Sequence, residues 1–71
     1  MASLKMRFGI RLKSLRAERG LTQEQLADAT ELSIESISNI ERGIFGPRFD
    51  NLEKIAAVLN LEVMQLFEFK K

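Results

Sequence analysis

Residues 33–42 combine side chains whose hydrogen-bonding groups suit the edges of base pairs. An Asn amide can pair with adenine through two hydrogen bonds, a Glu carboxylate can accept from the cytosine amine, and an Ile can contact the thymine methyl group. Projected as a helix at about 100° per residue, Ile37 and Ile40 share one side. The opposite side holds Glu35, Ser38, Asn39 and Arg42, with Ile34 at the margin. The pattern predicts a helix with one buried face and one face chemically suited to a nucleic acid.

Each of these residues also has a structural interpretation. Ile34 would add to the core, and Glu35 would favour the positive end of the helix dipole. Ser38 would simply be hydrated. Arg42 suits a phosphate better than a base.

Two short helices joined by a tight turn must position that face. Thr22, with Gln25 three residues later, has the pattern of a capping box and predicts a helix that stops near Thr30. Ser33 is a suitable N-cap for the next helix, which Gly43 would end.

The remaining sequence predicts further helices. Apolar residues at helical spacing predict a helix over about residues 4–19, closed by Gly20. Gly9 inside it indicates either close packing or a frayed first turn. Residues 44–49 are predicted to form a loop. Asp50 and Glu53 have the spacing of a capping box and predict a fourth helix, closed by Asn60. Residues 63–67 predict a short fifth helix. The predicted fold class is all-α, a compact five-helix domain.

The amino-acid composition argues against several classes of function. The chain has 71 residues, 45% of them hydrophobic, and predicts a single domain over 1–71 with its core at about 6–67. It contains no Cys and no His, so the usual metal ligands and neutral-pH acid–base groups are missing. We expect no enzyme activity, no catalytic residue, no metal and no cofactor. No apolar run is long enough to cross a membrane, which favours a cytoplasmic protein, associated with the nucleoid when bound to DNA.

Charge is unevenly distributed along the chain. Residues 1–20 carry six basic and one acidic side chain (net +5), residues 21–41 carry five acidic and no basic ones (net −5), and residues 42–71 carry five basic and four acidic (net +1). Acidic residues near DNA oppose binding. A DNA-binding interpretation therefore requires Glu24, Asp28 and Glu31 to point away from the DNA.

Three blocks of the sequence carry a family resemblance: LKSLRAERGLTQEQLA, ISNIERG and PRFDNLEKIAAVLNLEVMQLF. Together they resemble the phage-repressor/Cro-like helix-turn-helix proteins, also called the XRE family, over about residues 8–67. Counted from Gln23, the positions that are apolar in the motif hold Leu26, Thr30, Leu32, Ile37 and Ile40. The ninth position, usually Gly, is Glu31, which departs from the pattern and is strained if its backbone is left-handed.

The resemblance implies an all-α domain that binds double-stranded operator DNA, and it implies roles for individual residues. The base-reading set would be Ser33, Ile34, Glu35, Ser38 and Asn39. The phosphate contacts would be Gln23, Arg42, Arg48 and Lys13. Arg16 and Glu41 would form a structural ion pair that fixes the recognition helix.

A transcription regulator of this kind normally binds a palindrome as a homodimer, with the two reading helices about 34 Å apart. Apolar residues late in the chain suggest the dimer interface: Phe45, Met64, Phe67 and Phe69. Phe67 has an alternative role in closing the core. The alternative function is a protein-interaction module, antitoxin-like or partner-binding, that keeps the fold without strong DNA binding.

Overall fold

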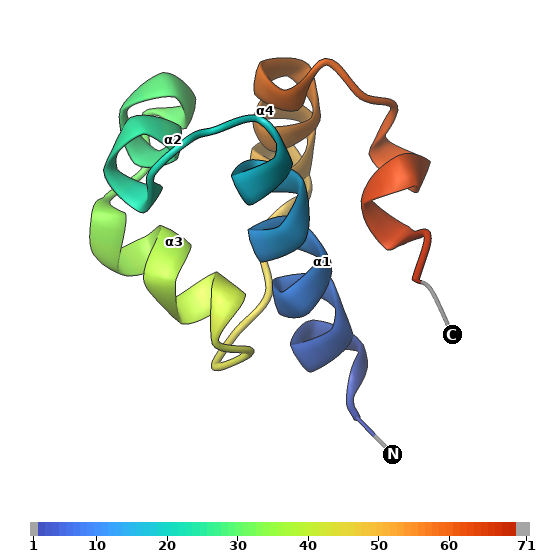
Figure 1. Cartoon of the computed structure of the whole chain (residues 1–71). Helices are drawn as coiled ribbons and strands as arrows, with labels where there is room; N and C mark the ends of the chain where they lie inside the picture. Colours follow the sequence, from blue (N-terminus) through green and yellow to red (C-terminus); the bar gives the residue numbers. More distant parts are fainter. Residues whose placement is uncertain (1, 70–71) are drawn as a thin grey trace.

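Four α-helices and one short 3₁₀ helix form the computed structural model, which describes residues 2–69 (Figure 1). In chain order they are α1 (Leu4–Glu18), α2 (Gln23–Thr30), α3 (Ile34–Glu41), α4 (Phe49–Leu59) and η1 (Val63–Phe67). The all-α fold class is confirmed, and the expected fifth helix is a 3₁₀ helix. The single-domain prediction also included residues 1, 70 and 71, which lie outside the described residues.

The first three helices begin at side-chain caps. The hydroxyl oxygens of Ser3, Thr22 and Ser33 accept the backbone N–H three residues later, at 3.3, 3.0 and 3.0 Å. At Thr22 the return bond is present too, because its backbone N–H donates to the side-chain oxygen of Gln25 at 2.9 Å. The predicted capping box of α2 is therefore confirmed, and the short helix gains the stability of two satisfied end groups.

All four α-helices end with a residue in the left-handed backbone conformation. The residue after it donates its N–H to the carbonyl five residues earlier, which is the Schellman motif. The left-handed residues are Gly20, Glu31, Gly43 and Asn60, with φ of 68, 62, 76 and 59°. The turn between α2 and α3 thus keeps the geometry that the motif requires, at the strain cost of a side chain on Glu31.

The predicted start of α4 is wrong by two residues. The helix begins at Phe49 with Arg48 as its N-cap, and no side chain caps it. Asp50 and Glu53 both lie inside the helix, so their three-residue spacing does not span its start. Asp50 in the first turn still favours the positive end of the helix dipole.

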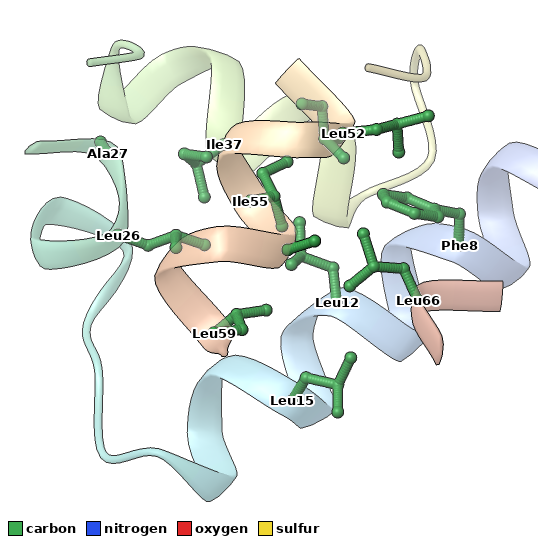
Figure 2. Close-up of a cluster of buried hydrophobic side chains, with 12 residues drawn as sticks. Phe8, Leu12, Leu15, Leu26, Ala27, Ile37, Leu52, Ile55, Leu59 and Leu66 are labelled. Atoms are coloured by element: carbon green, nitrogen blue, oxygen red, sulfur yellow. The ribbon is translucent and has the colours of Figure 1, made fainter. Parts of the chain in front are cut away.

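The core lies where all five elements converge (Figure 2). Leu12, Leu26, Ile37, Ile55 and Leu66 come one from each element, and each is at most 1% exposed. α3 packs against α1 and α2, α4 packs against α2, and η1 packs against α1 and α4. Figure 1 shows η1 on the opposite side of α1 from α2 and α3, so α3 keeps one face free of other elements.

Gly9 sits at the closest approach of α1 and α3. A Cβ atom there would lie 2.6 Å from the carbonyl oxygen of Glu41 and still nearer to that of Ile40. Of the two interpretations of this glycine, the structure supports close packing. Among the described residues, no helix has the length and apolar character needed to cross a membrane.

Candidate nucleic-acid interface

Three side chains from α1, α2 and α3 meet in one hydrogen-bonded cluster. The Nε atom of Arg16 donates to Oε2 of Glu41 at 2.6 Å, and a second guanidinium nitrogen donates to Oε1 at 3.0 Å. The amide nitrogen of Gln23 donates to the same Oε1 at 3.0 Å. The carboxylate of Glu41 is only 2% exposed. The cluster therefore joins the start of α2 and the end of α3 to α1.

The electrostatics of the cluster favour the charged form of Arg16. Hydrogen bonding to Glu41 raises the pKa of Arg16 above its ordinary value, against the opposing effect of burial. Arg16 also donates to the backbone oxygen of Leu21 at 2.7 Å. Because an ionised carboxylate only accepts hydrogen bonds, the amide group of Gln23 must turn its nitrogen toward Glu41.

The outer face of α3 carries the predicted base-reading residues. Ile34 is 51% exposed, Ser33 and Glu35 are exposed, and Ser38 and Asn39 are half-buried. The hydroxyl of Ser33 is already occupied in capping Ser36, to which it also donates at 2.9 Å. Within the described residues no hydrogen bond engages the side chains of Glu35, Ser38 or Asn39, so they remain available to a ligand.

The predicted phosphate contacts surround this face. Lys13 is exposed on α1, one helical turn from both Gly9 and Arg16, which contact α3. Arg42 is exposed at the end of α3. Arg48 is exposed at the start of α4 and lines a crevice of about 880 Å³ with Ser36. These three cations thus lie on α1, at the end of α3 and at the start of α4.

The acidic segment is arranged so that its charge is partly neutralised. Glu41 is paired with Arg16, and a carboxylate oxygen of Glu31 lies 3.6 Å from Nζ of Lys54. Asp28 and Glu31 lie at the end of α2 opposite to Gln23. Glu24 and Glu35, in contrast, lie in the first turns of α2 and α3, so only part of the negative charge of residues 21–41 is neutralised or held away from the start of α2.

The structure separates the residues predicted for a dimer interface. Phe67 packs on Phe8 with ring centroids 5.1 Å apart, so it serves the core, while its other neighbour is Phe69 at 6.2 Å. Phe69 also lies under the guanidinium of Arg7, 5.2 Å from the ring centroid. Phe45 lines the crevice beside Arg48, and Met64 is 75% exposed on η1. Phe67 and Phe69 are therefore neighbours, whereas Phe45 lines a different pocket from either of them.

Two features escaped the sequence analysis. Phe49 is 85% exposed, although we placed it in a loop with no role. Its spacing from Leu52 and Ala56 puts it on the apolar stripe of α4, a signal that the helix begins before Asp50. The bond from Gln23 to Glu41 was also missed, because it joins residues 18 positions apart and no local pattern reports it.

Among the described residues, no group of three or more Asp, Glu, His or Cys side chains is arranged to hold a metal ion. The polar groups of the site are amides, hydroxyls, guanidiniums, an amine and the carboxylates of Glu35 and Glu41. This chemistry suits hydrogen bonding and contact with phosphates.

Comparison with known proteins agrees with this geometry. A helix-turn-helix family model, HTH_3, matches residues 12–66. The chain is 41% identical over 58 residues to the immunity repressor protein of Bacillus phage phi105, an alignment that covers 82% of this chain and 40% of that protein. It is 41% identical over 68 residues to the control protein C.MunI of a Mycoplasma species, covering 94% of this chain and 92% of that protein.

Among solved structures, the chain is similar to the biofilm regulator SinR in complex with DNA. The TM-score is 0.81 at 34% identity, and the match covers 86% of this chain and 98% of the SinR chain. Against the first two curated relatives, this chain spans 40% and 49% of their lengths.

Proposed function

Because this chain belongs to the HTH_3 helix-turn-helix family, we propose that it is a sequence-specific DNA-binding transcription regulator that binds a palindromic operator as a homodimer. The family membership confirms the resemblance inferred from the sequence. The matched proteins are named as repressors and control proteins rather than as enzymes. We expect the protein in the cytoplasm, bound to the DNA of its cell.

One observation carries the proposal: the outer face of α3 presents hydrogen-bonding side chains without partners in the fold, while its inner face is locked. Ile37 is fully buried, and Glu41 fixes the end of the helix to Arg16. A rigid helix with free donors and acceptors on its outer face is what reading of the major groove needs. The solved DNA complex of SinR supports this use of the fold.

We assign base reading to Ser33, Ile34, Glu35, Ser38 and Asn39. Asn39 is the strongest candidate because neither its amide oxygen nor its amide nitrogen is hydrogen-bonded to another residue in the described part of the chain. Ser33 is the weakest because its hydroxyl caps α3.

We assign phosphate contacts to Gln23, Lys13, Arg42 and Arg48. Gln23 donates one amide hydrogen to Glu41 and has a second one to offer. It also stands at the start of α2, where free backbone N–H groups favour an anion. Glu41 is therefore a positioning residue for Gln23.

The size of the molecule is compatible with paired half-sites. The described chain is 32 Å along its longest axis, close to the spacing of about 34 Å between successive major-groove faces. A two-fold dimer that reads two half-sites one turn apart would place its α3 helices about 34 Å from one another on one face of the duplex.

Selection of bound duplexes from a random pool, followed by titration, tests the proposal. Asn39→Ala should cost about 1–3 kcal/mol and relax the preference at one base pair, whereas Arg48→Ala should weaken all duplexes alike. A selected sequence that is unchanged by Asn39→Ala would refute the base-reading assignment.

Salt dependence gives an independent check. Three cations per copy, Lys13, Arg42 and Arg48, predict about six neutralised phosphates per dimer and a slope of log affinity against log salt of about −5. If no duplex is bound even at low salt, the chain is instead a protein-interaction module.

A further inference from the structure

We propose that the two copies associate through an apolar groove between the starts of α1 and α4, with Phe49 of each copy inserted into the groove of the other. The groove has a volume of about 470 Å³. Its walls are Leu4 and Phe49, and its floor includes Phe8, Leu52 and Phe67. This inference rests on the proposed function, since it names the surface by which a homodimer forms.

Several apolar side chains around the groove are exposed to water, so their burial in an interface would be favourable. Phe49 is 85% exposed and Leu4 is 53% exposed. In a 3₁₀ helix, side chains three residues apart are eclipsed, so Met64, which is 75% exposed, lies on the same side of η1 as Phe67. A projecting aromatic ring beside an apolar groove of matching chemistry is self-complementary, which is the requirement of a two-fold contact.

Charge favours a second copy on this surface. Of the described residues that line the groove, only Lys5 is charged, and Asp50 follows Phe49 directly. When Phe49 enters the other copy's groove, its neighbour Asp50 can pair with Lys5 of the other copy, twice in a symmetric dimer. Its other neighbour, the exposed Arg48, carries the same charge as Lys5 and has to turn toward the duplex, where we assign its phosphate contact.

A second apolar surface, on α1, is less suited to contact with another copy because of its charge. It surrounds a smaller pocket of about 250 Å³ lined by Arg7, Ile10, Arg11 and Phe69. Two copies meeting there would bring four guanidinium groups together, which is unfavourable.

The size of the contact sets its strength. Nine of the described residues line the groove, and a contact confined to them would be smaller than an interface of standard size, which has about 20–30 residues per partner. The association is therefore weak in free solution and becomes effective when two copies occupy neighbouring half-sites, where the local concentration is high.

The groove is also continuous with the proposed DNA-binding side. Gly46 and Pro47 line both the groove and the crevice that contains Arg48. Association of two copies would thus hold this loop, and Arg48 with it, beside the duplex.

Sedimentation equilibrium of the full chain up to several hundred micromolar tests the inference without DNA. We expect a monomer–dimer equilibrium for the wild type. Phe49→Ser should weaken it about 100-fold, because a tenfold loss at one contact counts twice in a symmetric dimer. Leu4→Ser, on the opposite wall and distant in sequence from Arg48, should weaken it as well. Ile10→Ser, a matched control at a side chain 64% exposed on the other surface, should leave it unchanged within about threefold.

Binding to a selected palindrome and to its isolated half-site separates the two proposals. We expect Leu4→Ser to bind the half-site like the wild type and to lose cooperativity on the palindrome. The groove assignment would be overturned by dimerisation that neither Phe49→Ser nor Leu4→Ser affects, or by two wild-type copies that bind the palindrome independently. Either result would leave DNA binding intact and would point to another protein as the occupant of the groove. Dimerisation that is sensitive to both variants, together with no binding to any duplex, would support the groove and overturn the proposed function.

Discussion

Glu41→Gln is the most direct perturbation of the cluster that holds α3. The substitution removes the charge of a carboxylate that is 2% exposed and that accepts three hydrogen bonds, two from Arg16 and one from Gln23. A Gln side chain of the same shape can accept from one of these donors, but its own NH₂ group then faces another donor. The guanidinium of Arg16, 12% exposed, is left without its counter-ion.

The expected loss is about 3 kcal/mol. Removing one partner of a buried ion pair typically costs about 3–5 kcal/mol, and the lower end applies because Arg16 retains its bond to the backbone oxygen of Leu21. A domain of this size has a free energy of unfolding of about 4–10 kcal/mol, so the loss is a large fraction of the total. It corresponds to a fall in Tm of about 12–24 °C.

Urea unfolding followed by far-ultraviolet circular dichroism measures this loss, since the chain has no Trp or Tyr for fluorescence. Glu68→Gln is the matched control. It removes an acidic partner of Arg11 at 3.9 Å whose side chain is 66% exposed, and exposed pairs of this kind contribute little. We expect a change below about 0.5 kcal/mol.

Gln23→Ala tests whether the cluster acts as a unit. Alone it should cost about 1 kcal/mol, the value of one hydrogen bond, and in the Glu41→Gln background it should cost less, because the shared acceptor is already altered. If Glu41→Gln is no more destabilising than Glu68→Gln, the reasoning that burial makes this pair essential is refuted.

Two further substitutions test backbone features, and two predictions concern function. Gly9→Ala should destabilise the fold by about 2 kcal/mol or more, because the added methyl group forces α1 away from α3. Its control is Gly46→Ala, which should be neutral because no atom lies within 4 Å of the new Cβ. Equal melting temperatures for the two variants would contradict the close-packing argument. Glu31→Gly should raise the free energy of unfolding by about 0.5–1 kcal/mol, because Gly adopts the left-handed backbone at φ 62° without strain. The exposed contact of Glu31 with Lys54 contributes little. A loss of stability in urea would show that this contact matters more than the strain. Asn39→Ala should alter the selected operator at one position, and Phe49→Ser should weaken dimerisation about 100-fold as measured by sedimentation equilibrium.

Most helix boundaries followed from the sequence, because the interactions that begin and end a helix are local. Thr22 and Gln25 are three residues apart, and the closing bond at Gly20 spans five residues, from Leu21 to Arg16. The one wrong start, at α4, arose where no side chain caps the helix and the Asp50–Glu53 spacing imitated a capping box.

The contents of the site were only partly predictable. The polar face of α3 follows from helical periodicity, and the pairing of Arg16 with Glu41 was expected from the family resemblance. That Gln23 shares the same carboxylate oxygen required the structure, because it depends on how α2 packs against α3.

The sequence by itself determined an all-α helix-turn-helix domain whose second motif helix has one apolar and one hydrogen-bonding face, because capping and periodicity act over a few residues. Only the tertiary structure decided which apolar side chains stay outside. Phe67 turns onto Phe8, whereas Phe49 projects beside a groove built from α1, α4 and η1. Exposure depends on which distant segments cover a side chain, and no local pattern of residues specifies that.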